Sequence, residues 1–260
     1  MTYEITGKTK LTALLGSPVA HSISPQMHNE AFRCLGLDYA YLAFDVKPEE
    51  LETAVKGLAA AGIRGFNLTM PLKIQILPLL DELTPAARLA GSVNTVMVTD
   101  GRLVGHTTDG IGYMRSVMDA GHTITGKKMT LLGAGGAATA ICVQAALDGV
   151  RAIDMFKRKN TSWDKTGEFC KRLGEETGCH IRLLDIENPS QLAESLAGSA
   201  ILTNATSVGM APDAGCSPVP DGSMLHPGLV VSDIIYNPRE TMLMKQAKSM
   251  GCPCFNGLYM

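Results

Sequence analysis

The stretch KKMTLLGAGGAATAICVQAALDG (residues 127–149) constrains the fold more strongly than any other part of the chain. An apolar segment leads into a turn that fits G-x-G-x-x-A, and a run of small residues typical of a packed helix follows. In this motif the first glycine permits a tight turn and the second lets backbone approach a pyrophosphate, while the small third residue lets the helix pack on the strand. The residues expected to lie at such a pyrophosphate are Gly133, Ala134, Gly135, Gly136 and Ala137.

The surroundings of this turn are those that the motif needs. The next strand-like segment, VRAIDMFKRK (150–159), ends about 20 residues after the turn, and further strands and helices alternate beyond it. This alternation is typical of a doubly wound sheet. The turn taken alone also fits an ordinary strand-to-helix connection. We therefore expect a Rossmann-type, doubly wound dinucleotide-binding domain over residues 107–239.

The first part of the chain also alternates strands and helices. Strand patterns are found at 11–16, 39–46 and 63–70, and helix patterns at 24–37 and 48–62. Strand–helix–strand–helix–strand order is typical of α/β domains with parallel pairing. The fold class expected is therefore α/β with two domains, in which residues 1–106, joined by 240–260, form an N-terminal substrate domain.

Composition excludes several classes of function. The 260 residues carry a formal net charge of −2, so no bulk electrostatic attraction favours nucleic acid or an anionic membrane. No apolar run reaches the roughly 18 residues of a membrane span, and MTYEITGKTK lacks an apolar signal core, which predicts a cytoplasmic protein. The seven cysteines are scattered without a CxxC pair or a histidine cluster, so we expect free thiols and no metal site.

The end of the strand after the glycine turn indicates which dinucleotide would bind. NAD sites usually carry Asp or Glu there for the ribose 2′-OH, whereas NADP sites accommodate a 2′-phosphate with Arg. Here Asp154 lies inside the strand, too early for that role, and the strand runs into Lys157, Arg158 and Lys159. Such cations can bind phosphate through charge-assisted hydrogen bonds. The sequence favours NADP, with NAD use and a merely solvated basic turn as alternatives.

Three clusters of polar residues lack an easy structural explanation. They are Ser22 with Ser24, then Asn67, Thr69 and Lys73, and finally Asn94 with Asp109. Helix capping is the alternative role for Ser24 and for Asp109. Together the clusters supply hydroxyls, amides, one amine and one carboxylate near the ends of several strands. Such a set suits a small polyhydroxylated acid in a cleft between two α/β domains.

These segments, taken in order, resemble the shikimate dehydrogenase family, including its quinate/shikimate dehydrogenase branch. The matching motifs are SPVAHSISPQMHN, NLTMPLK, VNT, TDGIG, GAGGAA, NATSVGM and YNP. They recur along almost the whole chain, and the combination is far more specific than any one of them. The resemblance implies reversible reduction of 3-dehydroshikimate to shikimate with NADPH.

The resemblance also implies a role for each matching residue. Ser22 and Ser24 would hold the substrate carboxylate, and Lys73 and Asp109 would form the catalytic acid–base pair. Further substrate-binding residues would be Asn67, Thr69, Asn94 and Tyr236. Ser207, Asn237 and Gly257 would join the cofactor site, Ser207 and Gly257 near the nicotinamide. A small-molecule substrate and NADP are the expected partners, and no metal is needed. The sequence does not decide between a monomer and a homodimer.

The catalytic roles follow from the chemistry of the carbonyl. Its oxygen gains negative charge as hydride arrives and then needs a proton. An ammonium within hydrogen-bond reach supplies both charge stabilisation and an acid, which suits Lys73. Asp109 would orient the reacting hydroxyl and pair with the lysine.

The chain departs from the family pattern in three places. Thr107 stands where the aspartate motif usually has Asn, and the cofactor loop reads KRKN (157–160) where N-R-[RT] is common. Family members also continue beyond NGLYM with a helix that carries a substrate-binding Gln and packs on the first domain. A quinate/shikimate dehydrogenase with dual or NAD cofactor use is therefore the alternative. A non-catalytic dinucleotide-binding regulator would be expected to have lost Lys73 or Asp109.

Overall fold

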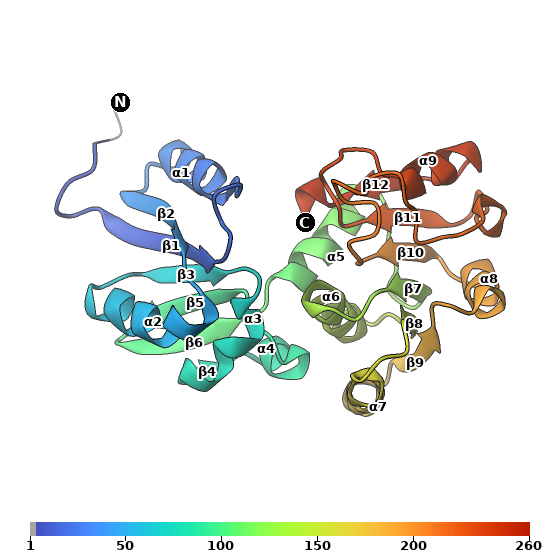
Figure 1. Ribbon diagram of the computed structural model, residues 1–260, viewed down its shortest axis with the longest axis horizontal. Helices are drawn as coiled ribbons and strands as arrows, with labels where there is room; N and C mark the ends of the chain where they lie inside the picture. The colour runs from blue at the N-terminus through green and yellow to red at the C-terminus, as the bar shows by residue number, and fades with distance from the viewer. Residues whose placement is uncertain (1–3) are drawn as a thin grey trace. The chain divides into compact units, whose positions relative to one another are not determined.

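The chain forms two compact units, each built around its own six-stranded sheet. The computed structural model describes residues 4–260. One unit extends to Thr108 and the other runs from Asp109 to Met260, close to the change of domain expected after residue 106. In Figure 1 helices pack on the faces of both sheets. The fold class is therefore α/β, as the sequence predicts.

The first unit alternates strands and helices over most of its length. In chain order its elements are β1 (Lys10–Gly16), α1 (Ser24–Leu35), β2 (Tyr39–Asp45), α2 (Leu51–Ala60), β3 (Gly65–Leu68), α3 (Leu72–Gln75), β4 (Glu82–Leu83), α4 (Pro85–Ala90), β5 (Thr95–Thr99) and β6 (Arg102–His106). Pro25 lies in the first turn of α1, where its missing N–H leaves no hydrogen bond unmade, and Gly36 ends the helix in the left-handed conformation. The order expected from the sequence is present from β1 to β3.

The sheet of the first unit has the order β2-β1-β3-β5-β6-β4 and is only partly parallel. β1 pairs in parallel with β2 and β3, as expected, but β5 runs antiparallel to both β3 and β6. Parallel pairing fails here because only Asp100 and Gly101 join β5 to β6. Their positive φ angles, 51° and 78°, are those of a two-residue hairpin turn, whereas a parallel crossover needs about a dozen residues.

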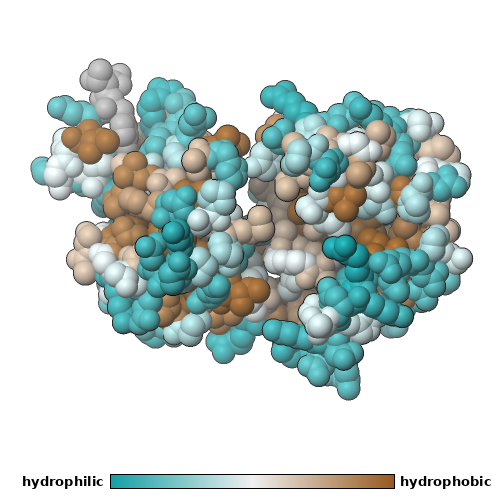
Figure 2. All heavy atoms as spheres, in the orientation of Figure 1, coloured by the Kyte–Doolittle hydropathy of each residue, from teal (hydrophilic) through white to brown (hydrophobic). Residues whose placement is uncertain are grey.

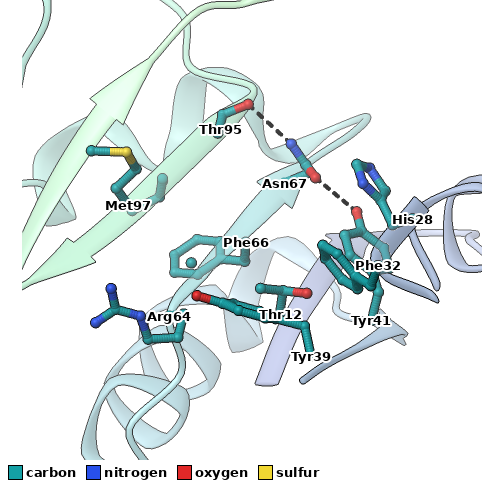
Figure 3. Close-up of a pocket in the computed structure, with 12 residues that line it drawn as sticks. Thr12, His28, Phe32, Tyr39, Tyr41, Arg64, Phe66, Asn67, Thr95 and Met97 are labelled. Carbon is teal, nitrogen blue, oxygen red and sulfur yellow. Dashed lines mark hydrogen bonds between the residues drawn. The ribbon is translucent and has the colours of Figure 1, made fainter. Parts of the chain in front are cut away.

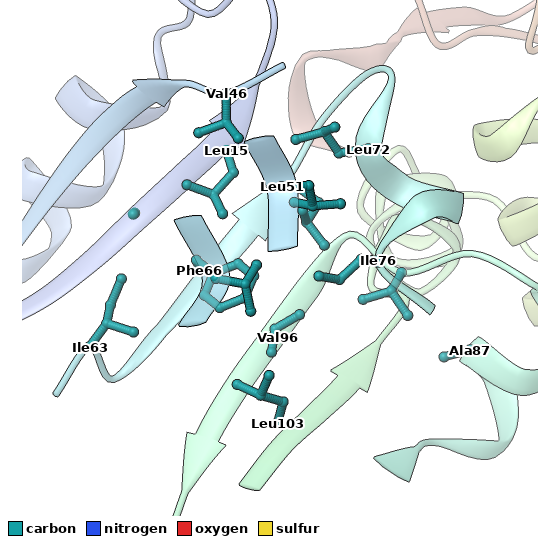
Figure 4. Packing of buried hydrophobic residues seen from close by; sticks show 14 residues of the cluster. Leu15, Val46, Leu51, Ile63, Phe66, Leu72, Ile76, Ala87, Val96 and Leu103 are labelled. Carbon is teal, nitrogen blue, oxygen red and sulfur yellow. The ribbon is translucent and has the colours of Figure 1, made fainter. Parts of the chain in front are cut away.

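The main core of the first unit lies on one face of this sheet, against α2, α3 and α4. Figure 4 shows the cluster, in which Leu15, Phe66 and Val96 of the strands meet Leu51 and Leu72 of the helices. Strand side chains alternate between the two faces, so the neighbours of these residues point to the opposite side. On that side α1 covers β1 and β2 through a smaller, separate cluster.

The second unit is a parallel sheet with helices between its strands. Its elements are α5 (Asp109–Asp119), β7 (Lys128–Leu132), α6 (Gly136–Leu147), β8 (Ala152–Lys157), α7 (Trp163–Thr177), β9 (His180–Asp185), α8 (Pro189–Ala197), β10 (Ile201–Asn204), β11 (Val230–Asp233), α9 (Met242–Ser249) and β12 (Cys254–Asn256). Neighbouring strands pair in parallel in the order β12-β11-β10-β7-β8-β9. This is the order of a doubly wound dinucleotide-binding sheet, with its switch point between β7 and β10.

Residues 240–260 lie in the second unit, whereas the sequence led us to expect them with the first. Helix α9 buries Leu243 and Ala247 in the same apolar cluster as Val231 of β11. Strand β12 then pairs in parallel with β11 and extends the sheet at its edge. These residues belong to the second unit because the apolar face of α9 packs against β11, the strand that precedes it in the chain.

The surface on the visible side of both units is largely hydrophilic, with hydrophobic side chains in separate patches (Figure 2). Within residues 4–260, no helix combines the length and the apolar character that crossing a lipid bilayer requires. The same part of the chain has no group of three or more His, Cys, Asp or Glu side chains arranged to hold a metal ion.

Candidate active site

Strand ends in the first unit bring the predicted substrate residues to one edge of its sheet. β1 and β3 are parallel, so both of their carboxyl ends lie at this edge. β5 is antiparallel to β3, with Asn67 opposite Thr95, and β6 pairs with β5 so that Thr95 faces His106. The start of β5 and the end of β6 therefore lie at the same edge. The loops that carry Ser22, Thr69, Lys73 and Asn94 all join the sheet there.

A glycine lets the loops after β1 and β3 come together. A Cβ added at Gly16 would lie 2.2 Å from Cγ2 of Thr69, so only glycine leaves room for the threonine. The backbone N–H of Thr69 donates to the carbonyl oxygen of Leu15 at 2.9 Å, and that of Ser17 donates to Met70 at 3.1 Å. Thr69 is thus held against the end of β1.

The two predicted carboxylate-binding serines lie at the start of α1. Ser24 is the first helical residue and Ile23 is the cap, so Ser24 does not cap the helix. The hydroxyl oxygen of Ser22 accepts the backbone N–H of Ser24 at 3.2 Å. Both side chains are therefore at a helix N-terminus, where the partial positive charge of the peptide dipoles favours an anion.

Asn94 organises the connection out of the first unit. Only 9% of this residue is exposed. Its Oδ1 accepts the backbone N–H of Thr108 at 2.8 Å, and its Nδ2 donates to the Thr108 hydroxyl at 2.9 Å. Thr107, which replaces the family's Asn, is itself buried. Asn94 therefore fixes the backbone directly before Asp109, a contact that the sequence pattern did not reveal.

The predicted catalytic residues belong to different units. Lys73 lies half-buried on α3, and its carbonyl oxygen accepts the backbone N–H of Val93 at 2.8 Å. Asp109 is the first residue of α5 and is also half-buried. Met70 and Ile74, which lie within three residues of Lys73 in sequence, are 74% and 61% exposed.

Asn67 makes three hydrogen bonds inside the first unit. Its Oδ1 accepts the Tyr41 hydroxyl at 2.8 Å, while its Nδ2 donates to the Thr95 hydroxyl at 3.0 Å and to the carbonyl oxygen of Asn94 at 3.3 Å. It lines a hollow of about 290 Å³ that also includes Tyr39 and Tyr41 (Figure 3). The amide thus braces β2, β3 and β5, and through Asn94 it supports the substrate edge of the sheet.

The second unit has a cavity of about 570 Å³ at the switch point of its sheet. Its lining comes from the glycine turn at 133–135, the end of β8, the loop at 205–208 and Ser217. Gly133 has a φ of 108°, and a Cβ there would lie 2.7 Å from the carbonyl oxygen of Ala205. The turn at 133–135 thus lines the cavity in close contact with the loop after β10, and α6 begins directly after it at Gly136, as in a pyrophosphate site.

The three predicted phosphate-binding cations have different environments. Lys157 and Arg158 line the cavity, but Lys159 does not. The Lys159 ammonium instead lies 3.6 Å from the Asp185 carboxylate and 5.7 Å from the centre of the Trp163 ring. The cavity thus combines an exposed peptide turn with two cationic residues, which fits a dinucleotide that carries an additional phosphate.

Three further predicted cofactor residues, Ser207, Asn237 and Gly257, and the predicted substrate residue Tyr236 follow the parallel strands of the same sheet. Ser207 lines the cavity directly after β10. Tyr236, which is 49% exposed, and Asn237 follow β11, and Gly257 follows β12. A Cβ at Gly257 would lie 2.0 Å from the carbonyl oxygen of Ile234. All four residues therefore lie beyond the carboxyl ends of parallel strands, although only Ser207 is among those lining the cavity.

A buried polar network supports the loop that carries Ser207. Asp233 accepts hydrogen bonds from Nδ2 of Asn204 at 3.1 Å and from the Thr241 hydroxyl at 2.7 Å. Oδ1 of Asn204 in turn accepts the backbone N–H and the hydroxyl of Thr206. Burial raises the pKa of Asp233. Sequence reasoning missed this pair, although Asn and Asp at the ends of adjacent apolar strands were a usable signal.

Known proteins are similar to this chain in sequence and in structure. A family model described as Shikimate dehydrogenase substrate binding domain matches residues 14–96. The protein named shikimate dehydrogenase (NADP(+)) from Listeria monocytogenes serotype 4b (strain F2365) is 51% identical over 260 residues, which cover 100% of this chain and 89% of that protein. This chain belongs to the shikimate dehydrogenase family.

The likeness to the shikimate dehydrogenase family extends over both units. A protein of the same name from Streptococcus pyogenes serotype M28 (strain MGAS6180) is 46% identical over 263 residues, covering 100% of this chain and 90% of that protein. A crystal structure of shikimate 5-dehydrogenase from Listeria monocytogenes in complex with shikimate and NAD has a TM-score of 0.95 and 51% identity. That match covers 99% of this chain and 89% of the other.

Proposed function

We propose that this chain catalyses the reversible reduction of 3-dehydroshikimate to shikimate with NADPH. The observation that carries the proposal is the 51% identity, over the whole chain, to a protein named shikimate dehydrogenase (NADP(+)). The structure supports it with two parts that this chemistry needs. One is a sheet edge rich in hydroxyls and amides beside Lys73, and the other is a dinucleotide cavity with cationic walls.

The unit that ends at Thr108 is the proposed substrate domain, and residues 109–260 are the proposed cofactor domain. Ser22 and Ser24 would hold the carboxylate at the N-terminus of α1, because hydroxyls and helix-end N–H groups suit an anion. Thr69 and Asn94 would bind ring hydroxyls, and Tyr236 of the second domain would also contact substrate. Asn67 would act by bracing Asn94 and Thr95, with which its amide is hydrogen-bonded.

Lys73 and Asp109 are the proposed acid–base pair. When bound, the nicotinamide supplies the hydride in the reductive direction and accepts it in the other. Lys73 would stabilise the negative charge that grows on the carbonyl oxygen and would donate a proton to that atom. Asp109 would accept a hydrogen bond from the reacting hydroxyl and keep it oriented. In the oxidative direction Lys73 would take the proton back.

NADP is the proposed cofactor. The peptide turn at 133–135, Arg158 and Ser207 would hold it, with Asn237 and Gly257 near its nicotinamide end. No Asp or Glu is among the residues that line the cavity, so the carboxylate that usually binds the ribose 2′-OH of NAD is lacking there. NAD is the second candidate, because it is the cofactor in the solved structure of the Listeria monocytogenes relative.

A dehydrogenase assay on the purified protein tests the proposal. Shikimate and quinate are each combined with NADP and NAD, and formation of reduced nicotinamide is followed by its absorbance. We expect shikimate with NADP to be the best pair. Lys73→Ala should lower turnover by roughly 10²- to 10⁴-fold, the usual contribution of a positioned acid or base.

Lys56→Ala is the matched control, because Lys56 is an exposed lysine of α2 that pairs with Glu52 on the same helix. It should keep full activity. A preference for quinate would retain the mechanism and assign the chain to the quinate branch of the family. Absence of turnover with all four pairs would overturn the proposed activity.

A further inference from the structure

The loop after β8 is built around a buried ammonium. Lys157 is 9% exposed, and its Nζ donates to Oδ1 of Asn160 at 3.1 Å, to Oγ of Ser162 at 2.5 Å and to Oγ1 of Thr166 at 3.1 Å. An ammonium has three N–H groups, so all of them are used by oxygens of the loop and of the first turn of α7. Lys157 therefore has no donor left for a ligand while this arrangement persists.

The acceptors of Lys157 are also joined to one another. Oδ1 of Asn160 accepts the backbone N–H of Ser162 at 3.1 Å and its hydroxyl at 2.9 Å. The Thr166 hydroxyl, one turn into α7, donates to the carbonyl oxygen of Ser162 at 2.8 Å. Residues 157–162 are thus tied to the start of α7. Burial lowers the pKa of Lys157, which agrees with an ammonium solvated by protein oxygens in place of water.

Arg158 has the opposite environment. It is exposed and lines the cavity, and its guanidinium makes no hydrogen bond or ion pair with any of residues 4–260. Lys159, the third cation, lies outside the cavity and faces Asp185 and Trp163. Of these three cations, Arg158 alone combines a place in the cavity with unused donors. A planar guanidinium can bind phosphate with two parallel hydrogen bonds.

We propose that Lys157 is a positioning residue for cofactor selection, whose ammonium fixes residues 158–162 so that Arg158 lines the cavity as the ligand of the ribose 2′-phosphate. This inference rests on the proposed function and deepens it. It differs from the sequence-based prediction, in which Lys157, Arg158 and Lys159 act alike as phosphate ligands. Lys157 acts on the phosphate site through the loop. Thr166 does not line the cavity, but its hydroxyl accepts a hydrogen bond from Lys157 and so contributes to the affinity for the phosphate.

Binding of two cofactor fragments to the full chain, measured by calorimetry, tests this inference. The fragments are 2′,5′-ADP, which carries the additional phosphate, and 5′-AMP, which does not. Arg158→Ala should weaken 2′,5′-ADP by about 10- to 100-fold, the equivalent of lost charge-assisted hydrogen bonds. Thr166→Val should weaken it by about threefold to tenfold, because it removes one acceptor of the ammonium. Binding of 5′-AMP should change less than twofold in both variants.

Two variants control for nonspecific effects on α7. Thr166→Ser keeps the hydroxyl and should restore wild-type affinity for 2′,5′-ADP. Thr177→Val removes a hydroxyl at the far end of the same helix, where it donates to the carbonyl oxygen of Leu173, and should leave affinity unchanged. If Thr166→Val binds 2′,5′-ADP as tightly as the wild type, Lys157 does not act through this loop and the inference is wrong.

A double-mutant cycle separates positioning from direct binding. Lys157→Met removes the charge but keeps most of the side-chain volume. If Lys157 acts by placing Arg158, then the variant with both Lys157→Met and Arg158→Ala should bind 2′,5′-ADP no more weakly than Arg158→Ala alone. Additive losses would identify Lys157 as a direct ligand and overturn the proposal. Urea unfolding of each variant verifies that it is folded.

Failure of this inference is distinguishable from failure of the proposed function. The fragments report on the adenosine end of the cavity without substrate or turnover. Equal affinity of the wild type for 2′,5′-ADP and 5′-AMP would overturn the role of Arg158 and of the loop, even in an enzyme that oxidises shikimate. Absence of shikimate oxidation alongside strong discrimination between the fragments would overturn the activity and keep the inference.

Discussion

Gly133 lies so close to Ala205 that a Cβ at position 133 would come within 2.7 Å of the Ala205 carbonyl oxygen. This contact joins the end of β7 to the loop after β10, at the switch point of the sheet. The φ of Gly133, 108°, is also one that residues with a Cβ rarely adopt. A side chain here would both strain the turn and separate two segments that line the cofactor cavity.

Gly133→Ala is therefore expected to lower the free energy of unfolding by about 1–3 kcal/mol, as strained backbone and overpacking do. Affinity for NADP should fall as well, because the turn no longer approaches the pyrophosphate. Urea unfolding and calorimetric titration measure the two effects. Gly136→Ala is the control for stability, since no atom lies within 4 Å of the Cβ it adds and α6 begins there. Equal stability of both variants would contradict the role given to this contact.

Gly16→Ala is expected to impair substrate binding without affecting the cofactor. The new Cβ would lie 2.2 Å from Cγ2 of Thr69, and this clash would displace Thr69 from the end of β1. We expect a higher KM for shikimate, affinity for 2′,5′-ADP unchanged, and a loss of stability of about 1–3 kcal/mol. Gly57→Ala, in α2 with no atom near the added Cβ, should be neutral or slightly stabilising. An unchanged KM for shikimate would argue against Thr69 as a substrate ligand.

Asp154 is a buried carboxylate with charged partners. Lys128 Nζ lies 2.8 Å away, Arg182 Nε donates to it at 2.7 Å, and the Ser195 hydroxyl donates at 2.7 Å. Burial alone would raise the pKa of Asp154, but the hydrogen bonds from Arg182, Lys128 and Ser195 outweigh it and lower the pKa to about 2. The folded state therefore stabilises the ionised Asp154 carboxylate relative to the unfolded chain.

The lowered pKa predicts how Asp154 contributes to stability as the pH changes. Its contribution, about 2–3 kcal/mol, is present above the unfolded pKa of about 3.9 and is lost as the pH falls from there toward about 2. Asp154→Asn should cost about 3–5 kcal/mol at neutral pH, because two cations lose their buried partner. Urea unfolding at several pH values should show the difference between wild type and variant shrinking in acid. Asp213→Asn, in an exposed loop, is the control for the removal of a carboxylate.

Much of the fold could be predicted because its signals are local. The order of strands and helices in the second unit follows from hydrophobic periodicity and from the glycine turn. The hairpin of β5 and β6 departs from the predicted α/β alternation, although Asp100-Gly101 is a recognised hairpin signal. The position of residues 240–260 depends on the apolar surface against which α9 packs. Periodicity indicates that α9 has an apolar face, but it does not identify the element on which that face packs.

The site was predictable in its residue types but not in its contacts. Polar residues at strand ends, such as Thr69 and Asn94, stand out in sequence because they interrupt apolar runs. The three cations at the end of β8 and directly after it are equivalent in the sequence, because the sequence conveys only their charge. Their separation into a loop-holding Lys157, a cavity-lining Arg158 and a Lys159 outside the cavity depends on the backbone path of the loop and on Thr166, a full turn into the next helix.

Asp233 provides the opposite case to Asp154, since the donors to its side chain within residues 4–260 are neutral. Burial raises its pKa, and hydrogen bonds from Thr241, the backbone of Ile235 and Asn204 only partly offset this. Its contribution to stability is therefore fully present below the unfolded pKa of about 3.9 and is lost as the pH rises through the raised folded value. The free-energy difference between wild type and Asp233→Asn should shrink as the pH rises, whereas that for Asp154→Asn should grow.

Asp233→Asn should also weaken NADP binding by about threefold to tenfold, because Asn204 would hold Thr206 less firmly beside the cavity. Urea unfolding across the pH range and calorimetric titration with NADP test both effects, with Asp213→Asn again as the control. A difference that grows with pH would mean that Asp233 is stabilised as an anion, and it would remove the reason for expecting the two carboxylates to behave in opposite ways.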